Sequence, residues 1–361
     1  MSFEKKDILR LLWPFALLYG IAVKVRNILF DKGIFKSHSF PLPVICVGNL
    51  TVGGTGKTPH TEYLIQLLSH HYKVSVLSRG YRRKTKGFYV AHAESTAHDI
   101  GDEPSQIKHK FPDITVAVCA QRTEGIRRLI AGEGDTIPDV ILLDDAYQHR
   151  QVKAGLNILL TDSHRLISED YLLPVGRLRE DFSGRLRADI VIVTKCAPDI
   201  TCTEMDRIAS QLQLLPHQKL FFSSLSYGHL FGAWTDVQRQ FSTLGKDTHI
   251  FLITGIAHPE PLLHQLQQTQ ALITSIRYPD HHHFSTADVR HINKIFADLS
   301  DDGKDAIIVT TEKDAARLRL CQGLSESVQR HLYILPIQVT FIGQQEELFH
   351  QTIMQYVREN Q

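Results

Sequence analysis

The stretch PVICVGNLTVGGTGKTP, residues 43–59, joins a short apolar run to a glycine-rich turn that ends in Gly56-Lys57-Thr58. The following residues, HTEYLIQLLSHH at 60–71, have the pattern of an amphipathic helix. A strand, a glycine-rich turn and a helix in this order direct backbone N–H groups and the positive end of the helix toward one anion. The stretch therefore predicts a loop that binds the phosphates of a nucleotide.

One position of this loop departs from the general phosphate-loop pattern. The pattern G-x-x-x-x-G-K-[ST] has a glycine six residues before the lysine, where this chain has Thr51. Neighbouring glycines supply the backbone freedom that the missing one normally provides. The alternative is a glycine-rich surface turn with a solvated lysine. The predicted nucleotide-binding residues are Thr51, Val52, Gly53, Gly54, Thr55, Gly56, Lys57 and Thr58.

Short β-branched runs alternate with helical segments beyond residue 40, which predicts a parallel sheet covered by helices on both faces. We expect an α/β fold: a P-loop NTPase-type parallel sheet domain, a smaller α/β domain and an N-terminal membrane-associating helix. The expected segments are 1–40, 41–228 and 229–361, with joint strands near 221–228 and 332–341. The expected strands are 43–48, 73–80, 113–120, 139–146, 156–162 and 188–195 in the first domain and 249–256, 271–280 and 305–314 in the second.

The N-terminal run LLWPFALLYGIAV, residues 11–23, has no charged residue and is flanked by lysine and arginine on both sides. It is too short to span a hydrocarbon layer of about 30 Å, which needs about 20 apolar residues. Trp13, Phe15 and Tyr19 with the flanking cations suit a helix that lies at a membrane surface. The alternative is a core helix packed on its own domain.

The composition narrows the classes of function. The chain has 361 residues, which is more than one hydrophobic core usually supports. A formal net charge of +1 argues against nucleic-acid binding by bulk electrostatics. Five scattered cysteines without a C-x-x-C pair predict a reducing, cytoplasmic setting.

An acidic pair at the end of another strand completes the predicted nucleotide site. Residues 140–143 are apolar and Asp144-Asp145 follow them. Phosphate loops use such a carboxylate, together with the loop hydroxyl, to hold Mg²⁺. The predicted metal ligands are therefore Thr58, Asp144 and Asp145. The two aspartates are equal candidates for the ligand that lies nearer to Mg²⁺.

Several other stretches carry groups suited to phosphoryl transfer. Asp102 opens a helix in the run IGDEP and is a candidate base, with helix capping as the alternative. Arg79 begins the basic run RGYRRK after a predicted strand, and clustered arginines suit phosphate binding, although most such clusters are solvated faces. Three adjacent histidines at 281–283 cannot all converge on one ion from a strand, so a zinc site there is disfavoured.

Seven motifs in this order resemble the tetraacyldisaccharide 4′-kinases, the lipid A 4′-kinases of Gram-negative bacteria. The motifs are VGNLTVGGTGKTP, SRGYRR, GDEP, LLDDAYQHR, LPVGRLRED, PDHHHF and TTEKDAARL. That family has threonine or serine ahead of V-G-G-T-G-K-T, so Thr51 follows it. This chain has Ala146 and Tyr147 where the family usually has Gly and Phe, which affects only the local turn.

The resemblance implies a reaction and roles for residues. The enzyme would transfer the γ-phosphate of ATP to the 4′-hydroxyl of a tetraacyl glucosamine disaccharide 1-phosphate at the cytoplasmic face of the inner membrane, giving lipid IVA. Asp102 would be the base, aided by His281, and the two would meet on domain closure. Lys57 and Asp145 would complete the catalytic set, with ATP and Mg²⁺ bound. Further site positions by similarity are Arg122, His149, Arg179 and Glu180.

Two rival functions stay open from the sequence. One is a GTPase-type metal-insertion protein, with Thr194-Lys195 as the candidate base-reading pair. The other is a membrane-bound nucleotide-sensing module without catalysis. We expect the lipid A disaccharide precursor and the inner-membrane surface as partners, no nucleic acid and no obligate protein partner.

Overall fold

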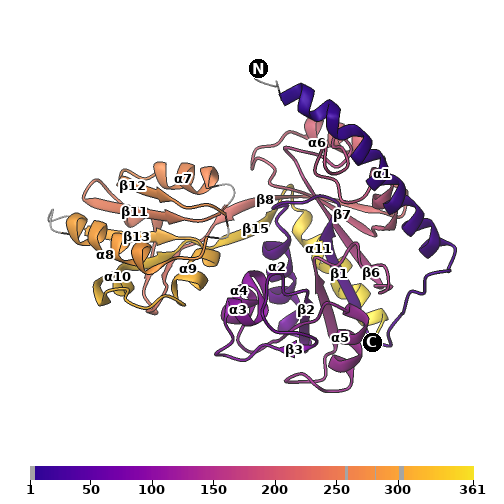
Figure 1. Cartoon of the computed structure of the whole chain (residues 1–361), viewed down its shortest axis with the longest axis horizontal. Coiled ribbons are helices and arrows are strands. Elements are labelled where there is room, and N and C mark those ends of the chain that lie inside the picture. Colours follow the sequence, from indigo (N-terminus) through magenta and orange to yellow (C-terminus); the bar gives the residue numbers. More distant parts are fainter. Residues whose placement is uncertain (1–4, 257–258, 281, 301–304) are drawn as a thin grey trace.

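The computed structural model describes residues 5–256, 259–280, 282–300 and 305–361, which form two α/β units (Figure 1). The first unit contains a nine-stranded sheet in the order β15-β8-β7-β6-β1-β5-β2-β4-β3. The strands from β8 to β4 run parallel, and the two edge strands are antiparallel. Its strands are β1 (Val44–Asn49), β2 (Val74–Ser78), β3 (Tyr89–Val90), β4 (Thr115–Val118), β5 (Val140–Asp144), β6 (Leu156–Asp162), β7 (Ile190–Thr194), β8 (Lys219–Tyr227) and β15 (Ile337–Phe341).

Helices cover both faces of this sheet, as expected for parallel strands. Alternate residues of β1 enter different cores: Val44 and Cys46 belong to one, Ile45 and Val47 to the other. The predicted α/β class is confirmed. The helices are α1 (Lys5–Asp31), α2 (Lys57–Ser69), α3 (Ala97–Ile100), α4 (Asp102–Lys110), α5 (Arg122–Ile130), α6 (Cys202–Leu212) and α11 (Gln345–Glu359), with the 3-10 helix η1 (Phe182–Arg187).

The second unit contains a six-stranded sheet in the order β10-β9-β14-β13-β11-β12, with α7 on one face and α8, α9 and α10 on the other. The four strands from β14 to β12 run parallel. The elements are β9 (Leu230–Gly232), β10 (Gln238–Arg239), β11 (Thr248–Thr254), β12 (Leu272–Arg277), β13 (Asp305–Thr310), β14 (Leu332–Ile334), α7 (Glu260–Gln267), α8 (Thr286–Ser300), α9 (Glu312–Leu318), α10 (Glu326–His331) and the 3-10 helix η2 (Phe241–Thr243).

The chain passes between the units along two paired strands. It leaves the first unit along β8 and returns along β15, which pairs antiparallel with β8 from Ser223 to Tyr227 (Figure 1). The C-terminal helix α11 then buries Phe349, Ile353 and Val357 in the same core as Ile45. Assigning all of 229–361 to the second domain was therefore wrong at its end, because this apolar helix face packs on the first sheet.

One predicted strand is shorter than expected. The run 305–314 ends as a strand at Thr310, and α9 begins at Glu312. The side chain of Thr311 accepts a hydrogen bond from the backbone N–H of Asp314 at 3.1 Å, so it caps the new helix.

Helix α1 extends along the outside of the first unit, away from the second unit (Figure 1). It is longer than its uncharged run, because the helix continues through Ile28, Leu29 and Phe30. Its stretch Leu12–Asp31 has a mean hydropathy of 1.3 and is long and apolar enough to cross a membrane by length and composition. The prediction that the apolar segment is too short to span a membrane applied to residues 11–23 and does not hold for the whole helix. Leu17 and Leu18 are 64% and 65% exposed.

Candidate active site

The loop between β1 and α2 lies at the centre of the first sheet and leads directly into a helix that begins at Lys57. Gly53 and Gly56 have φ values of +107° and +84°, in the region that favours glycine. Gly56 is the residue that immediately precedes the helix. The first N–H groups of a helix have no partner within it, so this end offers donors to an anion.

A second segment supports the loop from outside. The backbone N–H of Val52 donates to the carbonyl of Arg177 at 2.8 Å, and the N–H of Arg179 donates to the carbonyl of Leu50 at 2.6 Å. These bonds form a short antiparallel contact between Thr51 and the segment that carries the arginines. The first loop position therefore has extended backbone, which threonine adopts without strain.

Buried polar contacts hold the rest of the loop. The Asn49 amide donates to the Thr55 hydroxyl at 2.7 Å, and the Thr194 hydroxyl donates to the Thr55 carbonyl at 2.9 Å. At Gly48, an added Cβ would lie 2.6 Å from the Cβ of Tyr147. The Cβ and backbone of Tyr147 thus pack directly against the strand that enters the loop, and Gly48 makes this approach possible.

The two predicted acidic residues have different environments. Strand pairing places Asp144 beside Val47, just before the loop, and its side chain is buried. Burial raises the pKa of Asp144 to about 6, and the charges of Asp145 and Glu103 act in the same direction. Burial also disfavours the charged form of Asp145, but Lys57 and the Arg179 guanidinium outweigh it and lower its pKa.

Lys57 and Asp145 meet at the entrance of the loop. The Lys57 Nζ lies 3.8 Å from Oδ1 of Asp145, and Nη2 of Arg179 lies 2.8 Å from the same oxygen. Burial lowers the pKa of Lys57, while Asp145 and Asp144 raise it. Asp145 itself has φ +48°, an unusual value for a residue with a side chain. The strained turn directs its carboxylate to the two cations.

The groups around Asp144 suit a hard cation. Its two oxygens accept only long hydrogen bonds, from Thr61 at 3.4 Å and Ser78 at 3.5 Å. Among the described residues no cation lies within ion-pair distance of this buried carboxylate. Thr58 is buried at the start of α2. Carboxylate and hydroxyl oxygens that keep free lone pairs are the donors that Mg²⁺ takes together with phosphates.

Three of the predicted phosphate-binding residues influence one another. Arg122 is the first residue of α5, is buried, and donates through Nη1 to the carbonyl of Cys119 at 2.8 Å. Burial lowers the pKa of Arg122 to about 10, and the charge of Arg79 acts in the same direction. Burial lowers the pKa of His149 to about 4, with further contributions from Arg122 and Arg79. The Nε2 of His149 is buried and has no hydrogen-bond partner among the described residues.

The last two predicted positions contact the N-terminal helix. The Arg179 guanidinium reaches Asp145, and its backbone carbonyl accepts a hydrogen bond from Tyr19 at 2.8 Å. Glu180 is buried and accepts from Arg26 at 3.0 Å and from Arg187 at 2.9 Å. The side chain of Arg179 thus faces the loop between β1 and α2. The carboxylate of Glu180 instead forms ion pairs with Arg26 and Arg187 and so anchors α1.

Asp102 lies at the first position of α4, where the two units meet. Its Oδ2 accepts from Nη2 of Arg317, on α9, at 2.7 Å. The neighbouring Glu103 pairs with Lys313 at 2.9 Å. The charge of Glu103 also acts on the pKa of Lys57 and of Asp144, so this end of α4 faces the phosphate loop.

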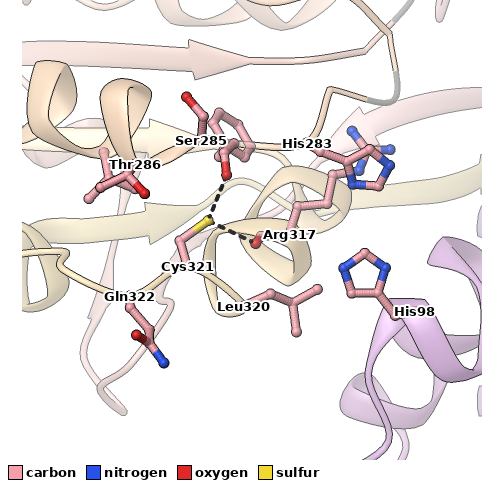
Figure 2. A pocket seen from close by; sticks show the side chains of 10 residues that line it. His98, His283, Ser285, Thr286, Arg317, Leu320, Cys321 and Gln322 are labelled. Carbon is pink, nitrogen blue, oxygen red and sulfur yellow. Dashed lines mark hydrogen bonds between the residues drawn. The ribbon is translucent and has the colours of Figure 1, made fainter.

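Two cavities adjoin this contact between the units. One of about 200 Å³ includes Asp102 and the cationic residues Arg82 and Lys84 in its lining. The other, of about 320 Å³, is shown in Figure 2, where His98 of the first unit and His283 of the second approach each other with Arg317 beside them. Their rings stack with centroids 5.6 Å apart.

The histidine run does not form a cluster in the described part of the chain. His281 lies outside the described residues. His282 contacts Asp288 through Nε2 at 3.0 Å, whereas His283 stacks on His98. Among the residues that the structure describes, no group of three or more His, Cys, Asp or Glu side chains has an arrangement that could hold a metal ion.

The sequence did not predict that Asn49 and Arg177 support the loop, or that Arg317 contacts Asp102. Asn49 and Arg177 act through contacts that no local pattern reveals. A signal for Arg317 is present, since α4 begins with acidic residues and α9 carries both Lys313 and Arg317. Opposite charges on two helices do not show that the helices touch.

Comparisons with known proteins agree on one family. A family model described as tetraacyldisaccharide-1-P 4′-kinase matches residues 8–358. A tetraacyldisaccharide 4′-kinase of Bacteroides fragilis is 50% identical over 97% of this chain and 93% of its own length. One of Flavobacterium johnsoniae is 46% identical over 97% of this chain and 98% of its own.

A solved structure extends the agreement to the fold. The "apo" form of LpxK from Aquifex aeolicus in complex with ATP matches with a TM-score of 0.74 and 28% identity. The match covers 97% of this chain and 99% of that one. Because the family model and the relatives span nearly the whole sequence, the chain belongs to the tetraacyldisaccharide-1-P 4′-kinase family.

Proposed function

We propose that the candidate site transfers the γ-phosphate of ATP to the 4′-hydroxyl of a tetraacyl glucosamine disaccharide 1-phosphate, giving lipid IVA, with the residue roles given below. The family supplies the reaction: the chain is an ATP-dependent tetraacyldisaccharide 4′-kinase of lipid A synthesis, a phosphotransferase that acts on a hydroxyl group. The observation that carries the roles is the meeting of the phosphate loop with Asp144 and with the N-terminus of α4.

The loop residues 51–58 bind the phosphates of ATP through backbone N–H groups and through Lys57. Lys57 lies beside Asp145 in a site that burial makes poorly solvated, where a cation stabilises phosphate charge more strongly than in water. Arg179 reaches the same carboxylate and adds a second cation. These groups stabilise the charge that develops as the bond between the β–γ bridging oxygen and the γ-phosphorus breaks.

Mg²⁺ would be held by Asp144, Asp145 and the hydroxyl of Thr58. When bound there, Mg²⁺ would supply positive charge that offsets the negative charge of the phosphates. Burial disfavours the ionised form of Asp144 and raises its pKa to about 6, so a bound cation would stabilise this carboxylate. Asp145 keeps its contact with Lys57 and so links the metal site to the loop.

Asp102 acts as the base on the acceptor, and His281 assists it. The 4′-hydroxyl proton passes to the Asp102 carboxylate as the sugar oxygen bonds to the γ-phosphorus and ADP leaves. The cavity of about 200 Å³ beside Asp102 gives the acceptor a place next to this base. Cations in its lining, Arg82 and Lys84, suit an acceptor that carries a phosphate.

Arg79, Arg122 and His149 form a cationic and polar group next to the metal site. Their mutual influence on pKa supports a common location, and the free Nε2 of His149 supports a contact with a bound ligand. Glu180 supports this group indirectly, since it anchors the helix that contacts Arg179.

Helix α1 attaches the enzyme to the cytoplasmic face of the inner membrane. Large apolar side chains are exposed along it, including Trp13, Phe15, Leu17 and Leu18. Burying them in the bilayer boundary is favourable by about 25 cal/mol per Å² of apolar surface. A tetraacyl acceptor stays in the membrane, so this attachment brings the site to its substrate, and ATP is available on the cytoplasmic side.

A kinase assay with radiolabelled ATP and the disaccharide 1-phosphate lipid tests these roles. We expect Lys57→Ala to lower kcat by about 10²–10³-fold and Asp102→Ala by about 10²–10⁴-fold. Lys153→Ala and Asp113→Ala alter exposed side chains and serve as matched controls. Full transfer by Lys57→Ala would contradict the phosphate role, and full transfer by Asp102→Ala would contradict the base role.

The two rival functions are not favoured. A metal-insertion GTPase and a non-catalytic sensing module both conflict with membership of a family of 4′-kinases. Thr194, the first residue of the suggested base-reading pair, donates instead to the loop carbonyl of Thr55, and Lys195 pairs with Asp162 at 2.7 Å. Preference for ATP over GTP in the same assay separates the proposal from the first rival.

A further inference from the structure

Helices α4 and α9 face each other across the two units through a series of charged pairs. Asp102 pairs with Arg317 at 2.7 Å and Glu103 pairs with Lys313 at 2.9 Å. About two turns further along α4, Lys110 pairs with Glu312 at 2.8 Å. The acidic start of α4 therefore meets two basic residues of α9, Lys313 and Arg317, and the candidate base is the first member of the series.

Arg317 is fixed more firmly than the other members. Its side chain is 3% exposed. Its Nη1 donates to the carbonyl of Gly255 at 3.1 Å and to Oδ1 of Asp314 at 3.0 Å, while Nη2 reaches Asp102. Asp314 is itself fully buried and accepts from the Gly255 N–H at 2.9 Å. The guanidinium is thus held by the second unit and presents one edge to the first.

A guanidinium in this position has two effects on a carboxylate. It favours the ionised form, which is the form that accepts a proton, and it restricts the direction of the oxygens. We propose that Arg317 is a positioning residue that orients Asp102 and keeps it ionised, so that the base is ready only when α9 is docked on α4. The inference rests on the proposed base role of Asp102.

The alternative is that Arg317 only joins the two units. If Arg317 contacted Asp102 only to join the units and released it during turnover, its removal would change stability or domain contact but leave the proton affinity of the base in the surviving enzyme unchanged. A pH profile therefore separates the two. Within the described part of the chain, the charged and titratable groups around Asp102, besides Arg317, include Glu103 on its own helix, Lys313 on α9, and the cavity residues Tyr81, Arg82, Lys84, His98 and His283.

The test compares kcat, KM for ATP and the pH dependence of kcat/KM for the full chain and its variants, with the disaccharide 1-phosphate lipid as acceptor. Removing a cation raises the pKa of a neighbouring carboxyl, by about 1–3 units for arginine beside aspartate. We expect Arg317→Ala to move the acid limb of the profile upward by about one unit or more. We also expect kcat to fall by about 100-fold, as for a misplaced catalytic group, with KM for ATP unchanged.

Arg317→Lys separates charge from orientation. Lysine keeps the cation but lacks the fork that reaches Gly255, Asp314 and Asp102 together. We expect an acid limb near its original position and a kcat at least about ten-fold lower. This variant also carries the test if Arg317→Ala does not fold, which a thermal melt decides. An unchanged kcat in Arg317→Lys would then overturn the proposal.

Arg319→Ala is the matched control. Arg319 lies at the same end of α9 and donates through Nη2 to the carbonyl of Ala233 at 2.7 Å, within the second unit. We expect its acid limb to stay in place. An acid limb of Arg317→Ala that coincides with those of the wild type and Arg319→Ala would overturn the proposal. Full activity in Asp102→Ala would instead remove the base role itself, so the two failures are distinguishable.

Discussion

The hydroxyl of Tyr19 donates a hydrogen bond to the backbone carbonyl of Arg179 at 2.8 Å, across 160 positions of sequence. The guanidinium of the same arginine contacts Asp145 and Asn49 beside the phosphate loop. An exposed apolar helix and the nucleotide site therefore share one residue. Next to it, Glu180 holds Arg26 of the helix with its buried carboxylate.

Glu180→Ala should weaken the attachment of α1 and with it the position of Arg179. Removing the carboxylate leaves Arg26 and Arg187 without their partner, and because these arginines are 38% and 24% exposed, the cost lies below that of a fully buried pair, which is about 3–5 kcal/mol. We expect a lower melting temperature and a lower kcat for lipid phosphorylation. Glu169→Ala, which removes a glutamate that accepts a hydrogen bond from Gln211 at 2.9 Å, should change neither. Equal behaviour of the two variants would contradict the anchoring role.

Asp144→Asn should make the free protein more stable and inactive. The buried carboxylate is costly to ionise, which its pKa of about 6 reflects, and an amide of the same size removes that cost. We expect a melting temperature a few degrees higher, since 1 kcal/mol corresponds to about 2–4 °C in a domain of about 150–250 residues. Phosphate transfer should be lost with the metal ligand. Asp139→Asn, at the residue just before the same strand, serves as the control, and retention of activity in Asp144→Asn would contradict the metal role.

The pH dependence of stability should carry a contribution from Glu62. Burial, together with the charge of Glu312, raises its pKa from 4.5 to about 7, and the ion pair with Lys110 offsets only part of this rise. The folded protein then binds this proton more tightly than the unfolded chain. The free energy of unfolding should therefore fall as pH rises from about 4.5 to 7, which is the opposite of the usual acid effect on salt-bridged carboxylates.

Glu62→Gln should flatten the profile in this window, as measured by urea unfolding at several pH values. Glu94→Gln, an exposed glutamate on the same unit, should keep the wild-type slope. If the Glu62→Gln slope equals that of the wild type, the buried carboxyl is not the group responsible.

Membrane attachment should depend on the exposed face of α1. Leu17 and Leu18 are both largely exposed, and burying a leucine is favourable by about 1.5–3 kcal/mol. We expect the double change Leu17→Ser with Leu18→Ser to weaken binding to phosphatidylethanolamine–phosphatidylglycerol vesicles by about ten-fold or more. ATP binding should persist. Leu272→Ser, an exposed leucine of the second unit, is the control, and unchanged vesicle binding in the double variant would exclude this face.

The α/β class, the glycine-rich loop between β1 and α2, and the place of Asp144-Asp145 at the end of β5 could be predicted because each depends on residues close together in sequence. A strand and a turn rich in glycine constrain the backbone locally, and alternation of apolar runs with helical segments implies parallel strands. The end of the second domain could not be predicted in this way. Helix α11 is an amphipathic helix at the C-terminus, and its sequence alone does not say which sheet its apolar face covers.

The sequence by itself therefore determined the family of the protein and the set of groups able to bind phosphate or accept a proton. Only the tertiary structure decided which of those charges neutralise one another. It places Glu180 against Arg26 rather than toward a ligand, and it places Arg317 of one unit on Asp102 of the other. The physical reason is that ion pairs form between side chains that are close in space but on helices far apart in the chain. Burial then determines how strongly the two charges of a pair interact.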